Sequence, residues 1–401
     1  MAMQVALGAL VALAGAVAPA AQTNPFELSL RDGRTVLASS LRGDPQRGFE
    51  AVVDGAPRRI GADELVAVHG AAAKVVELPA LHAPDGDVVY GQLVGGDANG
   101  DTVELQSPVL GRQEFRIDRV AAIAAAGVRD PLRLHLPDGV AEAIFLRAGV
   151  GHDMLAGALH RCGDTGVLFA PDGADAPRWF APQSFVALRI ADPTERRAAP
   201  AAWLTTRTGD RLAVALRRWT EAAVQLELDG GAVVDLRVAD LACLCFTAAG
   251  TFASDLVPTE VTESGIDAEV LYPWQRDRSV LGDPLVVGGR SHAKGLGVHS
   301  RSRLVFAVPA DAAFVWTRVG LDDAGLAAGV AAEVDVRVLV DGAVKFEQRG
   351  LRAGRPRDSG LLPVRAGQTV AFEVDCGRGR DVGDRVDWLS PVFLPAAGRR
   401  P

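Results

Sequence analysis

The chain has 401 residues, of which 48% are hydrophobic and 23% charged, and it carries a formal net charge of −8 at neutral pH. This length exceeds that of one ordinary domain and predicts two or three. The mildly acidic charge gives no general attraction to polyanions, so we expect no nucleic-acid partner. The 44 glycines and 23 prolines interrupt alternating apolar segments, and long amphipathic helical patterns are hard to find, so an all-β fold is favoured.

The first twenty residues have the pattern of an export signal. An uncharged apolar run from Val5 to Ala18 leads into Ala18-Pro19-Ala20, a small-x-small cleavage pattern, although no Lys or Arg precedes the run. The run is about 14 to 18 residues long and a bilayer-spanning helix needs roughly 20, so cleavage is favoured over a stable membrane span. We therefore expect a secreted, periplasmic or cell-surface protein.

Between Glu27 and about Gly250 one hydrophobic spacing occurs four times. A hydrophobic residue is followed by a second five positions later and by a third three positions after that. A strand ending at the first position, a short polar turn and a final strand carrying the other two would produce this spacing. Small SH3-like or Sm-like barrels are built in this way, a loose likeness that implies no RNA binding. The four triplets are Ile60, Leu65 and Val68; Phe115, Val120 and Ile123; Phe180, Phe185 and Leu188; Leu236, Leu241 and Leu244.

A strand pair around a turn precedes each triplet, as at Asp32-Gly33 and Asp85-Gly86. Each unit is about 55 to 65 residues long, enough for a five-stranded barrel but marginal for independent stability, so we expect the units to pack on one another. The predicted boundaries are 1–20 for the export signal, 27–70, 73–128, 131–193 and 200–250 for the four barrel-like repeats, and 258–396 for a C-terminal sandwich.

The four cysteines are interpreted as free thiols. Cys243 and Cys245 lie two positions apart in a strand-like run, so their Cα atoms would be about 6.6 Å apart. This separation is near the upper limit for a disulfide. Cys162 and Cys376 complete the set, and no Cys/His group has the spacing of a zinc site.

Three short segments in the last third of the chain are the most informative. They are Lys294 to Ser300, which reads KGLGVHS, Val319 to Asp323, which reads VGLDD, and Asp384 to Trp388, which reads DRVDW. Apolar runs of period two lie between them, joined by turns such as Asp341-Gly342, which indicates antiparallel strands.

These residues resemble the NPCBM family of carbohydrate-binding modules over roughly Val261 to Leu394. The family's opening Trp and Asp-Arg-Ser segment matches Trp274 to Ser279, and its Lys-Gly-hydrophobic-Gly-x-His turn matches Lys294 to His299. The VGLDD segment matches completely, whereas the closing run departs from the family pattern at Arg385, Val386 and Leu389. The resemblance implies a jelly-roll-like β-sandwich of the kind found as an accessory domain on exported bacterial glycoside hydrolases.

A sugar site needs an aromatic ring against the sugar C–H groups and a few fixed polar groups for the hydroxyls. Trp388 beside Asp387 is the best single candidate for the platform, with a core position as the alternative. His299 either contacts ligand or locks its turn through a backbone hydrogen bond, and Trp316, on one face with Phe314, is interpreted as core. The candidate carbohydrate-binding residues are Trp388, Asp387, Arg385, Trp274, His299 and Asp323.

The sequence has no recognised catalytic signature. It lacks a Gly-x-Ser-x-Gly elbow, a His-Glu-x-x-His segment, a P-loop and a GxGxxG loop. Asp322 with Asp323, or Asp384 with Asp387, would supply the carboxylate pair of a glycosidase, but solvated turn residues are the better interpretation in a binding module. No cofactor is expected. A structural calcium ion stays open as an alternative, since hard cations bind clustered oxygens, here Asp375, Asp381, Asp384 and Asp387.

The sequence therefore predicts an exported, non-catalytic carbohydrate-binding protein. A single shallow sugar site gives only modest affinity, roughly −4 to −8 kcal/mol. The alternative is a structural or protein-interaction scaffold of the cell envelope, in which the sugar site has degenerated and the N-terminal repeats hold a protein partner. A hydrolase with an unrecognised site is a weaker third hypothesis.

Overall fold

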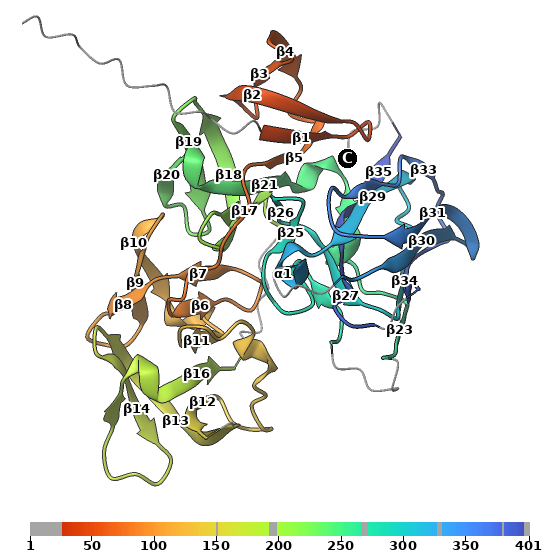
Figure 1. The fold of residues 1–401 in the computed structure, drawn as a ribbon. Helices are drawn as coiled ribbons and strands as arrows, with labels where there is room; N and C mark the ends of the chain where they lie inside the picture. The colour runs from red at the N-terminus through yellow and green to blue at the C-terminus, as the bar shows by residue number, and fades with distance from the viewer. Residues whose placement is uncertain are drawn as a thin grey trace, which may run out of the picture.

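The computed structural model describes residues 26–149, 151–191, 199–265, 272–326, 331–378 and 381–396. The predicted export signal, residues 1–20, lies outside these ranges. The strand pairings in the described chain are antiparallel, and its one α-helix is the short α1 (Asp323–Leu326) (Figure 1). The all-β fold expected from the composition is confirmed.

The strands before residue 250 form four successive groups, each closed by pairing between its first and last strands, β1–β5, β6–β11, β12–β16 and β17–β21. The first group contains β1 (Phe26–Leu30), β2 (Thr35–Asp44), β3 (Gly48–Val53), β4 (Ala56–Ile60) and β5 (Leu65–His69). The second contains β6 (Ala80–His82), β7 (Val88–Tyr90), β8 (Gln92–Gly95), β9 (Thr102–Ser107), β10 (Gly111–Arg116) and β11 (Ala122–Ala124). The third contains β12 (Glu142–Ala148), β13 (Gly151–Gly163), β14 (Gly166–Pro171), β15 (Arg178–Phe180) and β16 (Phe185–Ile190), and the fourth β17 (Ala202–Thr206), β18 (Arg211–Trp219), β19 (Ala223–Leu228), β20 (Val233–Arg237) and β21 (Leu241–Phe246).

The recurring hydrophobic triplets lie where a strand, a tight turn and the last strand of each group follow one another. Single 3-10 turns, η1 (Ile117–Arg119), η3 (Pro182–Ser184) and η4 (Val238–Asp240), precede the last strand in groups two to four. Eleven of the twelve triplet side chains are buried, and Phe115 packs half-buried against the same core. The spacing thus reflects one side chain at or next to the end of a strand and two in the next strand, except that Val120 of the second group lies just before β11. That the groups are repeats of one unit stays a prediction.

The groups join in pairs through their last strands. Strand β5 of the first group lies beside β21 of the fourth, with His69 opposite Cys243, and β11 of the second lies beside β16 of the third, with Ile123 opposite Leu188. Backbone hydrogen bonds therefore continue from one group into the next. Each of these four strands is paired on both sides, so none of them is an exposed sheet edge. Figure 1 shows the first and fourth groups (red and green) together, with the second and third (orange and yellow-green) below them.

The chain after residue 250 is a β-sandwich. One sheet contains β24 (Gln275–Arg276), β27 (Gly295–His299), β35 (Arg385–Pro395), β29 (Ala312–Leu321) and β32 (Arg357–Asp358), with β22 (Thr251–Phe252) and β33 (Leu362–Pro363) at its sides. The other contains β23 (Glu260–Glu263), β28 (Ser302–Ala307), β34 (Thr369–Cys376), β30 (Val334–Val340) and β31 (Ala343–Leu351). The hairpin β25 (Leu285–Val287) and β26 (Arg290–His292) and the 3-10 turns η2 (Pro131–Arg133), η5 (Thr247–Ala249) and η6 (Ala253–Asp255) complete the described elements.

All four cysteines are free, and Cys162, Cys243 and Cys245 are buried, as the sequence predicts. Burial raises the pKa of the Cys162 and Cys243 thiols to about 12, so both are protonated at neutral pH. These thiols are inert core residues.

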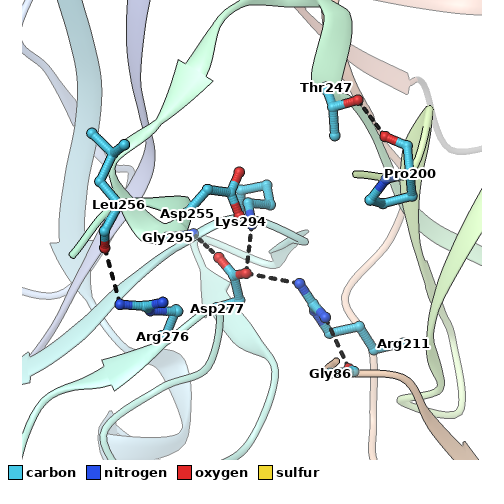
Figure 2. Close-up of polar contacts among 10 residues, drawn as sticks. All are labelled: Gly86, Pro200, Arg211, Thr247, Asp255, Leu256, Arg276, Asp277, Lys294 and Gly295. Atoms are coloured by element: carbon cyan, nitrogen blue, oxygen red, sulfur yellow. Dashed lines mark hydrogen bonds and ion pairs between the residues drawn. The ribbon is translucent and has the colours of Figure 1, made fainter. Parts of the chain in front are cut away.

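The sandwich is joined to the N-terminal strands by a cluster of buried charges. The Lys294 ammonium lies 2.5 Å from Asp255 Oδ1 and 2.6 Å from Asp277 Oδ2, and Arg211 of β18 donates to the same Asp277 oxygen at 2.8 Å (Figure 2). The other Asp277 oxygen accepts the backbone N–H of Gly295 at 3.0 Å. Asp277 has a φ of 57°, a left-handed conformation that aspartate adopts more readily than most residues. One carboxylate therefore joins two parts of the fold.

Charge pairing decides the ionisation of Asp277. Burial raises the pKa of this carboxyl, but the nearby charges of Lys294 and Arg211 outweigh burial, so its pKa lies below the usual value. Lys294 itself is completely buried and also lies near the aromatic rings of Trp203 and Phe252. Loss of the carboxylate would leave two buried cations with too little compensation.

We predict that Asp277→Asn lowers the free energy of unfolding by about 3–5 kcal/mol, because breaking a buried ion pair leaves an uncompensated charge. Urea unfolding followed by tryptophan fluorescence measures the change. The control is Asp32→Asn, whose partner is Arg34. Because both side chains of that pair are largely exposed, its loss should change stability by no more than about 1 kcal/mol. Equal effects of the two substitutions would contradict the assignment.

Candidate functional site

One end of the sandwich gathers partly exposed aromatic and polar side chains. His299 is the last residue of β27 and lies directly opposite Arg385, the first residue of β35. The ring of Tyr272 packs on that of His299 with 5.0 Å between centroids and 30° between planes. We call Tyr272, Trp274, His299 and Arg385 the aromatic edge; all four side chains are neither buried nor fully exposed.

The hydrogen bond of His299 fixes which of its nitrogens can meet a ligand. Its Nδ1 lies 2.7 Å from the carbonyl oxygen of Ser300, and because a carbonyl only accepts, Nδ1 donates. The neutral ring then carries its acceptor at Nε2. His299 therefore makes the backbone hydrogen bond that the sequence analysis considered for it. The same bond leaves Nε2 as the nitrogen that can accept a ligand hydroxyl.

Trp274 is held at the neighbouring edge strand. Its backbone N–H donates to Glu263 Oε1 at 2.7 Å, which ties the start of β24 to the edge of the second sheet. Partial burial raises the pKa of the Glu263 carboxyl. The indole packs against the sandwich core, with the Arg276 guanidinium 5.5 Å from the ring centroid. The ring is therefore positioned from both sheets while part of its surface stays in solvent.

Asp384 binds Ser300, the residue whose carbonyl oxygen accepts the hydrogen bond of His299. Its Oδ2 accepts the hydroxyl of Ser300 at 2.7 Å, whereas Oδ1 is buried without a hydrogen-bond partner. Burial first, and the nearby Asp381 charge second, raise the pKa of Asp384 to about 6. This carboxyl positions the turn between β27 and β28 and is itself shielded from ligand.

The prediction that Trp388 is the sugar platform is wrong. The Trp388 side chain is completely buried, and its ring lies 5.2 Å from that of Phe372 inside the sandwich. Asp387 is also completely buried, beside the nearly buried Asp322. Neither residue reaches solvent, so Trp388 takes the core position considered as the alternative, and Asp387 cannot bind a sugar hydroxyl.

Asp323 binds a turn from a different part of the domain. Its two carboxylate oxygens accept the backbone N–H groups of Gly288 and Gly289 at 3.0 and 2.8 Å. It therefore fixes the turn between β25 and β26, and its assignment as a ligand contact stays a prediction. Trp316, interpreted as core, is buried as expected.

Tyr272 was missed by sequence reasoning. The chain has only two tyrosines, and this one precedes Trp274 by two positions, so the pair of aromatics was visible in the sequence. Of the six candidates, Trp274, His299 and Arg385 are partly exposed, and Asp323 is partly exposed but already bonded to two backbone amides. Trp388 and Asp387 are completely buried.

The aspartates considered for calcium are not gathered into one group. Asp375 pairs with Arg301 at 3.0 Å, and Asp387 lies inside the sandwich. Within the described ranges, no group of three or more His, Cys, Asp or Glu side chains is arranged to hold a metal ion. A helix with the length and apolar character for crossing a bilayer is likewise not found in the described part of the chain.

Residues 250–394 match the family model described as NPCBM/NEW2 domain. The C-terminal third is an NPCBM/NEW2 domain. The resemblance noted over Val261 to Leu394 is thereby confirmed. This family model does not extend over the four N-terminal strand groups.

Several solved structures are similar to parts of the chain. A CBM51 domain from Clostridium perfringens GH95 in complex with methyl-galactose is 21% identical, with 36% of this chain and 99% of that chain covered and a TM-score of 0.32. A structure of CBM51-2 in complex with GlcNAc and INT domains from Clostridium perfringens ZmpB is also 21% identical, with 51% and 46% covered and a TM-score of 0.33. No curated protein matches the chain.

The buried pair Asp322 and Asp387 predicts an unusual pH dependence. Burial and the neighbouring Asp322 charge raise the pKa of Asp387 well above its usual value of 3.8, so the folded state holds its proton more tightly than the unfolded state. The contribution of this carboxyl to stability is then greatest below about pH 4 and falls as pH rises through the folded pKa, by up to about 1.4 kcal/mol per pH unit for one proton.

We expect Asp387→Asn, which resembles the protonated acid, to unfold at higher urea concentration than the parent at pH 8 and to lose this advantage at pH 4. Urea unfolding across that range measures the difference. Asp311→Asn, at an exposed position, is the control and should follow the parent. Parallel pH profiles for the parent and Asp387→Asn would contradict the raised pKa.

Proposed function

We propose that this protein is an exported, non-catalytic carbohydrate-binding protein whose NPCBM/NEW2 domain binds glycan weakly through the aromatic edge. The observation that carries the proposal is the contact between the Tyr272 and His299 rings, with Arg385 directly opposite His299 on the neighbouring strand. The family match supports carbohydrate binding at the level of the domain. The sequence of residues 1–20 supports export, and the mass of the mature chain tests whether that segment is removed.

The chemistry of the aromatic edge suits a pyranose. An exposed part of an aromatic face packs against sugar C–H groups, and Trp274 and Tyr272 provide such surfaces. His299 Nε2 offers an acceptor and the Arg385 guanidinium offers several donors, so hydroxyls on one ring edge find both kinds of partner. His299 and Arg385 lie in paired strands, and Trp274 immediately precedes β24, which is paired with β27, so their backbone positions are fixed before binding and the ordering cost is lower.

The carboxylates favour a binding role over hydrolysis. Asp322 and Asp387 are buried inside the sandwich, and Asp323 holds two backbone amides. A glycosidase needs two carboxyl groups that flank a bound sugar with room for water or direct attack. None of these three carboxyls lies free at the aromatic edge.

We predict that Trp274→Ala and Tyr272→Ala each weaken glycan binding about tenfold, which corresponds to ~1.4 kcal/mol of lost stacking. Isothermal titration with methyl galactoside, N-acetylglucosamine and methyl glucoside identifies a binding sugar and measures the change. Val233→Ala, at an exposed position in a different strand group, is the matched control. Unchanged affinity in both aromatic variants would refute the aromatic edge as the sugar site.

A protein-interaction scaffold is the second candidate. It is favoured by the burial of Trp388 and Asp387 and by a groove of about 1060 Å³ between the first and fourth strand groups, lined in part by Arg42, Arg59 and Arg218. Capture experiments with the full chain and with Trp274→Ala separate the candidates. A protein partner retained equally by both, together with no response to any sugar, would favour the scaffold.

A further inference from the structure

The six tryptophans differ sharply in exposure. Trp203, Trp219, Trp316 and Trp388 are buried and Trp274 is half-buried, whereas Trp179 is 43% exposed. Trp179 lies in β15 of the third strand group, far along the chain from the NPCBM/NEW2 domain. It therefore presents the largest aromatic surface of any tryptophan in the chain outside the candidate site already described.

Strand register explains why Trp179 points outward. Its neighbour Phe180 fills the interior of the group together with Phe169. On the opposite face, Trp179 lies across from Leu168 of β14, which in turn lies across from Arg161 of β13. Trp179 is not one of the residues of this core.

The indole lies against the backbone at Gly163. A Cβ atom added to this glycine would be 2.9 Å from Cη2 of Trp179 and 3.3 Å from Cζ3. Only the missing side chain allows this close approach of ring and backbone. The ring is thus supported on one side by the end of the β13–β14 hairpin, which gives a fixed, flat surface.

The surroundings of the ring are polar. The Arg161 guanidinium carbon lies over the ring, 5.4 Å from its centroid, which is the distance of a cation–π contact. This distance is longer than the roughly 3.5–4.0 Å of van der Waals contact, so Arg161 covers that face only loosely. Arg161, Asp164 and Thr165 are exposed, the latter two at the hairpin tip next to Gly163. A protein-docking patch requires a broader apolar area, whereas one flat ring edged by donors and acceptors matches a sugar.

We propose that Trp179 is a second carbohydrate-stacking platform, on which the apolar face of a pyranose packs while Arg161 and Asp164 bind its hydroxyls. This site is independent of the aromatic edge, since it belongs to a different strand group and shares no residue with it. Two weak sites in one chain would raise retention on a polysaccharide, because the second contact forms at high effective concentration.

The test uses the full chain with ¹⁵N-labelled tryptophan, whose indole N–H signals report each ring separately. Trp179→Phe and Trp274→Phe assign the two relevant signals. The probes are cellohexaose, chitohexaose and a β-1,4-galactan oligosaccharide, each raised to about 10 mM to cover weak binding, with sorbitol as a non-ring control. We expect at least one oligosaccharide, but not sorbitol, to shift the Trp179 signal saturably, and to do so in Trp274→Ala as well.

A matched pair of variants tests the geometry. Gly163→Ala places a methyl group where the indole now rests, so the ring must move and the response of the Trp179 signal should fall at least threefold. Ser184→Ala, exposed in the same strand group, should leave the response unchanged. If only the Trp274 signal responds, the Trp179 platform is overturned and the aromatic edge stands. If neither signal responds to any probe, both sites are overturned.

Discussion

The buried contact between Lys294 and Asp277 is the interaction on which the rest of the structure depends. Asp277 follows Trp274 by three residues, and Lys294 immediately precedes β27, which ends at His299. One ion pair thus fixes both chain segments that form the aromatic edge. Arg211 binds the same carboxylate from the fourth strand group, so the position of the edge is tied to the N-terminal strands as well. Removing such a charge from water is costly, and only mutual pairing offsets the cost.

The residues that mark the family are largely those that hold the sandwich together. Lys294 is a buried cation, Asp322 and Asp387 lie inside, Asp323 closes a turn and Trp388 packs on Phe372. Buried polar groups restrict a fold to one arrangement because alternative arrangements leave them without partners. These residues therefore identify the domain without identifying its ligand. Two groups of the proposed sugar site, Tyr272 and Arg385, lie outside the family markers or at a position where this chain departs from the family pattern.

Much of the fold could be predicted from the sequence, whereas most of the site could not. Alternation and the Asp341-Gly342 turn predicted the β30–β31 hairpin, because a period of two and a left-handed turn are local properties. The exposure of Trp388 depended on register: it lies between Leu296 and Val319 on the inner face, and a shift of one residue would have turned it outward. Trp179 is exposed because its neighbour Phe180, and not Trp179 itself, fills the core. The position of its ring also depends on the absence of a side chain at Gly163. Neither fact is local.

The way the strand groups are joined bears on how two sugar sites would act together. The first and fourth groups share backbone hydrogen bonds through β5 and β21, and the sandwich packs on these strands, with the His69 and His292 rings 4.3 Å apart. The third group joins the second through β16 and β11, and Arg278 of the sandwich donates to the backbone of Arg129 beside them. Contacts of this kind hold platforms at a fixed separation, unlike a flexible linker. With a fixed separation, the gain in affinity depends on whether two sugar rings of one polymer can reach both platforms at once, so polymer geometry selects the ligand as much as the chemistry of either platform.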